Sequence, residues 1–242
     1  MPQRISDNIF AVFSNVDITL DSGQRAIIKT GLFSEFEQGI EMKVVRIKND
    51  CIMLNEPGTV DADYRGEIGV ILKNNLSKAI DIKQGGMIAW IVMAPYINPI
   101  KFDTRSHGSK LAAGYDIFSA KDIAIAPEKK GFIETSGEFV FAERGNIASV
   151  RGRSGNAINL GLYVPEEIYE FDEKFSLTGV WVTNHGNETI TLPAGSKVAQ
   201  AVFSKAIGPL LDVEIEEIFE LSKTERDTGG FGHSDNKITA NT

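Results

Sequence analysis

The sequence predicts an all-β chain of sandwich or barrel type, and three observations support this prediction. Short β-branched or apolar runs recur along the chain, each bounded by Gly, Asn, Asp, Ser or Pro. One pattern of such runs occurs twice. Residues 212–222 form the clearest helical candidate, and even they fit an extended segment. The six clearest strand-like runs are residues 16–20, 42–47, 69–72, 87–92, 123–126 and 179–183.

A faint internal repeat indicates two copies of one β unit. Residues 17–30 align with residues 122–135, so Asp17 matches Asp122 at a difference of 105 in residue number. Two more pairs of segments align in the same order. They are residues 69–74 with 179–184 and residues 83–89 with 193–199, both differing by 110. Similar offsets in one order favour a duplication, and chance likeness between β-rich segments is the alternative.

The repeat divides the chain into four parts. Residues 1–93 form an N-terminal β unit, and residues 111–222 form a C-terminal β unit. Residues 94–110 are polar, carry two prolines and are interpreted as the connector. Residues 223–242 are polar and Gly-rich, which is typical of a flexible tail.

Composition excludes several classes of protein. The 242 residues suffice for a hydrophobic core, and no apolar run reaches the roughly 18 residues that a membrane span needs. The single cysteine, Cys51, cannot form an internal disulfide, so we expect a reducing intracellular compartment, nuclear or cytoplasmic. A net charge of −8 without a basic run argues against a nucleic-acid partner. A small polyphosphate held by local cations and a divalent metal is compatible with this charge.

Five segments combine the residue types that handle phosphate, metal or water. They are residues 57–66 (PGTVDADYRG), 111–117 (LAAGYDI), 151–157 (RGRSGNA), 193–202 (PAGSKVAQAV) and 226–235 (RDTGGFGHSD). Each has an ordinary structural alternative when it is taken alone. In order, these are a solvated hairpin turn, a core strand, a plain loop, a strand with one buried amide and a disordered tail.

Together the five segments resemble the five motifs of the dUTPase family. Those motifs are Val-Asp-x-Asp-Tyr-Arg-Gly, Ala-x-Gly-x-Asp, Arg-Ser-Gly, Gly-x-x-x-Ala-Gln and Arg-x-x-x-Gly-Phe-Gly. The Asp-x-Asp-Tyr-Arg-Gly motif stands third in the common trimeric enzymes, whereas here it comes first. This order resembles the duplicated, monomeric dUTPases of herpesviruses. The resemblance therefore implies a jelly-roll or β-barrel fold, one active site per chain, and a monomer that hydrolyses dUTP to dUMP and pyrophosphate.

The resemblance assigns the water and the nucleoside to the first motif. Asp61 would orient the attacking water, and Tyr64 would lie under the deoxyribose and exclude a 2′-hydroxyl. The hairpin of residues 55–60 would present main-chain groups to the uracil edge.

The resemblance assigns the phosphates to the other motifs. Asp116 would hold a water on Mg²⁺, while Arg153, Ser154 with the Gly155 amide, and Gln200 would lie among the phosphates. In the tail, three kinds of contact are implied. Arg226 and Ser234 would bind the γ-phosphate, and Phe231, followed by Gly232, would stack on uracil as the lid closes.

Six positions depart from the family pattern: Gly152, Asn156, Ser196, Lys197, His233 and Asp235. The resemblance places His233 and Asp235 beside Ser234, among the residues that would bind the γ-phosphate. Asp235 would add a negative charge near a polyphosphate. We therefore expect a KM for dUTP that is higher than is typical. Restoring Ser at 233 and Gly at 235 should lower it.

Two other functions remain open from sequence alone. A dCTP deaminase shares the fold, but it requires a Glu acting on cytosine C4, and Glu56 is the only candidate in the hairpin. A dUTPase-like protein that has lost catalysis and binds other proteins is the second alternative. The presence of Asp61, Asp116 and Arg226 argues against it.

Overall fold

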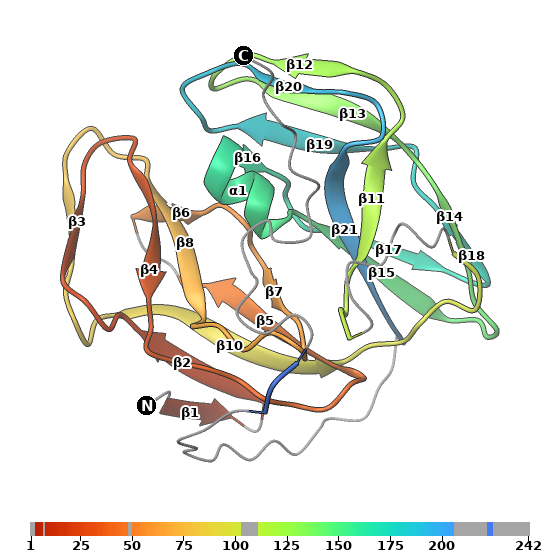
Figure 1. Ribbon diagram of the computed structural model, residues 1–242, viewed down its shortest axis with the longest axis horizontal. Helices are drawn as coiled ribbons and strands as arrows, with labels where there is room; N and C mark the ends of the chain where they lie inside the picture. The colour runs from red at the N-terminus through yellow and green to blue at the C-terminus, as the bar shows by residue number, and fades with distance from the viewer. Residues whose placement is uncertain (1–2, 7, 48–49, 103–110, 206–221, 225–242) are drawn as a thin grey trace.

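The computed structural model describes residues 3–6, 8–47, 50–102, 111–205 and 222–224 (Figure 1). This part of the chain is almost entirely β, as the alternating apolar runs predict, and every predicted run overlaps a strand. No helix among these residues is long and apolar enough to cross a membrane. The segment 212–221 of the helical candidate lies outside the described residues.

The N-terminal half builds three small sheets. The largest has the strand order β1-β2-β10-β5-β7, with all neighbours antiparallel. A second sheet has the order β4-β8-β6, and β3 pairs with β9. The strands are β1 (Gln3–Ser6), β2 (Ile9–Phe13), β3 (Ile18–Leu20), β4 (Arg25–Lys29), β5 (Ile40–Arg46), β6 (Cys51–Met53), β7 (Gly58–Val60), β8 (Gly69–Asn74), β9 (Ile80–Ile82) and β10 (Met87–Pro95).

The C-terminal half repeats the plan in one larger sheet of order β16-β19-β13-β11-β21-β15-β17, with the pairs β12-β20 and β14-β18 beside it. Its strands are β11 (Tyr115–Ser119), β12 (Ile123–Ile125), β13 (Lys130–Ser136), β14 (Glu138–Val140), β15 (Asn146–Arg151), β16 (Leu162–Tyr163), β17 (Glu167–Phe171), β18 (Lys174–Ser176), β19 (Gly179–Asn184), β20 (Ile190–Leu192) and β21 (Lys197–Lys205). The helix α1 (Ser154–Leu160) follows β15.

Each half encloses its own apolar core, because the inward-facing residues of its strands alternate with exposed ones. The C-terminal core is rich in aromatic rings, and Phe203 packs against four other phenylalanines and Tyr115. A third, smaller apolar cluster joins the halves: Leu54 and Ile71 from the N-terminal half contact Ala157 of α1.

The two halves meet along α1, which lies between them in Figure 1. Arg25 of β4 donates from Nε and Nη2 to the carbonyls of Ile158 and Asn159, at 2.8 and 3.0 Å. These carbonyls belong to the last turn of the helix, where main-chain acceptors lack helical partners. The C-terminal end of the helix is therefore satisfied by the other half of the chain, and its N-terminal end is directed towards the site described next.

Candidate active site

A pocket opens where the two halves meet, and it contains residues from two of the five sequence motifs. It holds about 440 Å³ of empty space, its mouth included. Asp61, just after β7, and Ser154, at the start of α1, both line it. The full lining is Val44, Asn55, Gly58, Thr59, Val60, Asp61, Tyr64, Ile68, Gly69 and Ser154.

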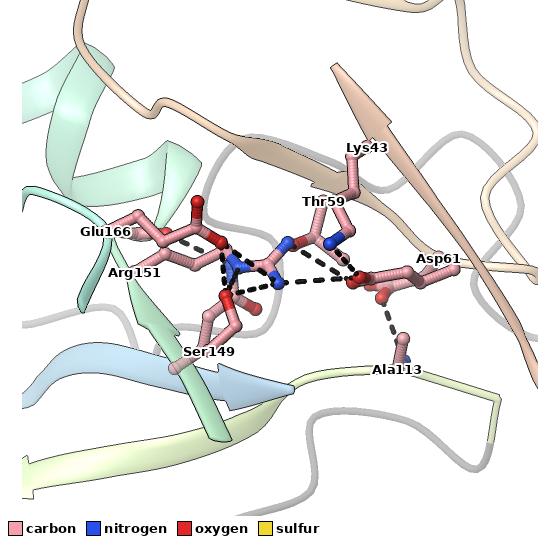
Figure 2. A network of polar contacts seen from close by, with 10 residues as sticks. Lys43, Thr59, Asp61, Ala113, Ser149, Arg151 and Glu166 are labelled. Atoms are coloured by element: carbon pink, nitrogen blue, oxygen red, sulfur yellow. Dashed lines mark hydrogen bonds and ion pairs between the residues drawn. The ribbon is translucent and has the colours of Figure 1, made fainter. Parts of the chain in front are cut away.

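Asp61 begins a tight turn, so the two carboxylates of the Asp-x-Asp motif diverge. Asp61 is half-buried at the pocket, whereas Asp63 is buried within the turn. The turn closes through the Tyr64 N–H, which donates to the Asp61 carbonyl at 3.0 Å. The Asp61 carboxylate accepts a hydrogen bond from the backbone N–H of Ala113 in the C-terminal half, at 3.2 Å (Figure 2). Asp61 therefore contacts both halves.

Tyr64 lines the pocket, and its hydroxyl donates to the Glu67 carbonyl at 3.0 Å. The motif requires glycine at position 66, since a Cβ there would stand 2.3 Å from the Tyr64 hydroxyl. The close approach of the Tyr64 ring to the backbone at position 66 thus explains why a glycine follows two residues after the tyrosine.

Arg65 connects this turn to residues 222–224. Its guanidinium donates to the carbonyls of Ala62 at 2.7 Å and Ser222 at 3.0 Å, and it pairs with Glu35 at 3.4 Å. Thr224 donates to the Asp63 carbonyl at 2.6 Å. The chain therefore runs directly beside the Asp61 turn two residues before Arg226.

Asp116 lies on β11 and is 4% exposed. Arg153 Nε approaches its Oδ1 at 2.9 Å, and Lys197 Nζ approaches its Oδ2 at 3.0 Å. Lys197, a departure from the family pattern, thus supplies a second cation for this carboxylate. The buried charge is balanced by two cations from different elements of the C-terminal half.

Gln200 pairs with Asp116 across the β11–β21 ladder. Its Nε2 donates to the Gly152 carbonyl at 3.0 Å, which fixes the amide beside the residue 151–157 motif. A Cβ on Gly114 would stand 2.3 Å from Gln200 Oε1, so the glycine of the Ala-Gly-Tyr-Asp motif makes room for this side chain. Asn156 donates to the Lys197 carbonyl at 2.8 Å and joins the same group.

Arg153 caps α1, and Gly155 is buried in its first turn. A short helix therefore begins within the Arg-Ser-Gly motif. Arg226, Phe231, Gly232, Ser234, His233 and Asp235 lie outside the described residues.

The sequence patterns missed a buried group of charges around Arg151, next to the pocket. Figure 2 shows Arg151 reaching Ser149 and Glu166 on one side and Thr59 on the other. Lys43 pairs with Glu41 in the same group at 2.9 Å. Arg151 begins the segment 151–157 but precedes its Arg-Ser-Gly motif, so no motif pointed to this group.

Magnesium fits this donor set as an ion carried by the substrate. Among the described residues, no three His, Cys, Asp or Glu side chains gather closely enough to hold a metal. Asp116 Oδ2 is buried and accepts no hydrogen bond, although the Lys197 ammonium is near it. It can accept a hydrogen bond from a metal-bound water, which suits Mg²⁺ because this ion keeps several waters.

Comparison with known proteins identifies the family. The dUTPase family model matches residues 1–107 and again residues 100–235. The chain belongs to the dUTPase family. This confirms the resemblance to the dUTPase family and makes the chain a nucleotide hydrolase of the dUTP diphosphatase type. It also confirms that the chain contains two dUTPase units.

Curated relatives each match about half of this chain. The deoxyuridine 5′-triphosphate nucleotidohydrolase of Brucella melitensis biotype 2 is 38% identical over 119 residues, covering 47% of this chain and 75% of the relative. That of Nautilia profundicola is 36% identical over 113 residues, covering 44% and 80%. Among solved structures, the dUTPase of the Staphylococcus aureus phage phi11 is 20% identical, covering 45% of this chain and 91% of that one, with a TM-score of 0.39.

Proposed function

We propose that this chain hydrolyses dUTP to dUMP and pyrophosphate in one site formed by both halves and the C-terminal tail. The observation that carries the proposal is that Asp61 and Ser154, from motifs in different halves, line the same pocket. The reaction is an in-line attack of water on the α-phosphorus. It would keep uracil out of DNA and supply dUMP for dTMP synthesis.

The nucleoside occupies the part of the pocket formed by the N-terminal half. The hairpin around β7 lines it with Asn55, Gly58 and Val60. Main-chain groups of this hairpin read the donor and acceptor pattern of uracil, and a close fit excludes the thymine methyl. Tyr64 lies under the deoxyribose and rejects UTP by excluding a 2′-hydroxyl.

Asp61 orients the water and accepts its proton late in the reaction. Its Oδ1 is anchored by the Ala113 N–H, which fixes the direction in which the carboxylate faces the water. The anchor belongs to the segment leading into β11, the strand of Asp116. The carboxylate is therefore held relative to the residues that bind the phosphates, as in-line attack requires.

The phosphates lie along the C-terminal half. Ser154 and the Gly155 amide contact the α- and β-phosphates, and Arg153 lies between these phosphates and Asp116. Gln200 contacts a phosphate or a metal-bound water, and Asp116 holds a water on Mg²⁺. The ion, when bound, neutralises charge developing on the phosphate oxygens.

The tail closes the site. Arg226 and Ser234 bind the γ-phosphate, and Phe231 with Gly232 covers the uracil. The contacts of Ser222 and Thr224 beside the Asp61 turn support this role, because they bring the chain to the pocket immediately before Arg226.

The pocket lined by residues of both halves and the two family matches support a monomer with the permuted motif order of herpesvirus enzymes. In this arrangement residues 1–93 donate the Asp61 motif, residues 111–222 donate the phosphate motifs, and residues 223–242 supply the lid. A viral source and action in the nucleus or cytoplasm of a host cell belong to the same proposal.

The test compares Asp61→Asn with the parent chain in the presence of Mg²⁺. The parent should release pyrophosphate and protons from dUTP but not from dCTP, UTP or dTTP. Asp61→Asn should lower kcat by about 10²- to 10⁴-fold, because the water loses its acceptor. Asp21→Asn, an exposed turn aspartate, is the control and should match the parent.

Three outcomes would change the assignment. Ammonia release from dCTP would move it to the deaminases. No turnover of any nucleotide by a folded chain would favour a binding protein. Full activity of Asp61→Asn would remove Asp61 from its assigned role.

A further inference from the structure

Arg151 is a fully buried cation that crosses from one half of the chain to the other. Its side chain has 0% exposure, and its Nη1 lies 3.2 Å from Glu41, a residue of β5 in the N-terminal half with a side chain 4% exposed. The two residues stand 110 positions apart in the sequence. The contact therefore exists only when the two halves are docked.

The rest of the guanidinium is also satisfied, as Figure 2 shows. Nε and Nη2 donate to the Ser149 hydroxyl at 3.1 and 2.7 Å, and Nη2 lies 3.6 Å from Glu166. Nη1 also donates to the Thr59 hydroxyl at 3.3 Å. A planar fork of donors suits a residue that must hold several acceptors in fixed directions.

These contacts lie on both sides of the pocket. Thr59 belongs to β7 and precedes Asp61 by two residues. Arg151 ends β15, two residues before Arg153 and three before Ser154. One side chain thus joins the strand that carries the water-orienting carboxylate to the strand that carries the phosphate loop.

Stability alone does not account for this arrangement. Desolvating a buried ion pair costs about as much as the attraction returns, and well-packed apolar residues are often equally stable in its place. The N-terminal half provides an example within the same chain. Val45 pairs with Trp90 on β5 and β10 as Arg151 pairs with Gln200 on β15 and β21, so the repeat accepts an apolar residue at this register.

We infer that Arg151 is a positioning residue for dUTP hydrolysis: it sets the register of Asp61 against the Arg153–Ser154 phosphate loop by holding Thr59 and Glu41. This inference rests on the proposed function. Arg151 touches no reacting atom; it acts through the two strands. A small shift of β7 along β15 moves the water away from the line of attack while leaving the individual contacts to uracil and phosphate in place.

Thr59→Val tests the link with the least disturbance. Valine has nearly the same shape and suits a strand, so only the hydrogen bond to Arg151 is removed. We expect kcat for dUTP to fall about fivefold, with KM within about threefold of the parent and an unchanged Tm. A parent-like kcat in this variant would count directly against the inference.

The double variant Arg151→Met, Glu41→Gln removes both buried charges together. Lys43 and Glu166 lose these partners, but their side chains are 26% and 30% exposed, so water can solvate them. We expect a Tm within a few degrees of the parent, because the desolvation cost disappears with the attraction, and a kcat lowered about fiftyfold. A structural role predicts the opposite, with activity returning as Tm returns. Arg144→Met, which breaks an exposed ion pair with Glu173, is the matched control and should match the parent.

Hydrogen exchange of the substrate-free chain supplies a readout independent of turnover. Amides of residues 58–64 should exchange faster in both test variants than in the parent, since β7 loses its hold on β15. Unchanged exchange together with parent-like kcat would overturn the inference. If the parent fails to hydrolyse dUTP, the proposed function fails, while the exchange comparison still decides whether Arg151 holds β7.

Discussion

The two halves of the chain share the same side-chain hydrogen bonds at one turn. In the N-terminal half, Asn74 donates to the carbonyls of Leu20 and Lys78 at 2.8 and 2.7 Å. In the C-terminal half, Asn184 donates to those of Ile125 and Glu188, both at 2.8 Å. Both asparagines are fully buried. The faint sequence repeat therefore reflects one folding unit, whose turns are satisfied by the same side chain in the same way.

The halves differ at the ladder positions of Asp116 and Gln200. Asp116 and Gln200 pair across β11 and β21, whereas the matching pair across β2 and β10 is Ala11 and Trp90. The N-terminal half has no acidic or amide group at that register. The comparison shows that the duplicated framework is retained in both copies, while the residues proposed to bind phosphate at this register occur in one.

The variant with the largest expected effect tests whether only the C-terminal half binds phosphate at this register. Gln200→Ala should lower kcat/KM by about 10²-fold, because it removes the side chain that stands opposite Asp116 in the β11–β21 ladder and donates to the Gly152 carbonyl. Trp90→Ala, at the matching register of the other half, should change kcat/KM less than about twofold, since Trp90 is 38% exposed and lies away from the pocket lining. Equal losses in steady-state assays with dUTP would show that both halves contribute phosphate contacts.

Much of the fold followed from local sequence. Alternating apolar residues between turn residues determined the strands, and β10 differs from its predicted run only by extending to Pro95. The chain turns after Asp61, so Asp61 lines the pocket and Asp63 does not.

The contacts between halves were not predictable from these patterns. The pairs Arg151–Glu41 and Lys73–Glu128 each join residues far apart in sequence. Periodicity reports which face of a strand is buried but gives no information about which other strand covers it. The family motifs located Asp116 and Gln200. Arg151 belongs to none of these motifs, and its contacts are seen only in the folded chain, where β7 docks on β15.

A second prediction tests whether the shared framework is equally important in both halves. Asn74→Ala and Asn184→Ala each remove the asparagine donor from one buried and one part-buried carbonyl, at a cost of about 3 kcal/mol. Each should lower Tm in calorimetry by about 8 °C. A loss confined to one variant would show that only one of the two cores limits unfolding. Thr19→Ala, which removes an exposed hydrogen bond to Asp81, provides the control.

The next difference lies at the turn before β4 and β13. Gly23 has φ +75°, and its counterpart Glu128 has φ +57°, which is costly for any residue with a Cβ. Both N–H groups donate to the matching asparagine carbonyl, at 3.0 and 2.8 Å. The glutamate compensates by reaching across to Lys73, a buried side chain of the other half, at 2.9 Å.

Two variants separate the strain from this ion pair. Glu128→Ala loses the contact and keeps the strain, whereas Glu128→Gly loses the contact and relieves the strain. We expect the glycine variant to be more stable than the alanine variant by about 1 kcal/mol in the free energy of unfolding. Equal stabilities in urea unfolding would mean that the left-handed backbone is not strained at this turn.

The smallest effect concerns pH, because His185 lies 3.5 Å from Glu128 in this contact between the halves. Burial, and then the nearby Lys73 cation, lower the pKa of His185 below its ordinary 6.5. As pH falls below 6.5, the unfolded chain therefore binds a proton before the folded chain does, and Tm decreases. The hydrogen bond from Lys73 lowers the pKa of Glu128 below 4.5, so its contribution is lost only at more acidic pH. His185→Gln should reduce the fall in Tm between pH 7.5 and about 5.5. An identical pH profile would mean that His185 titrates alike in both states and that this side of the interface is open to water.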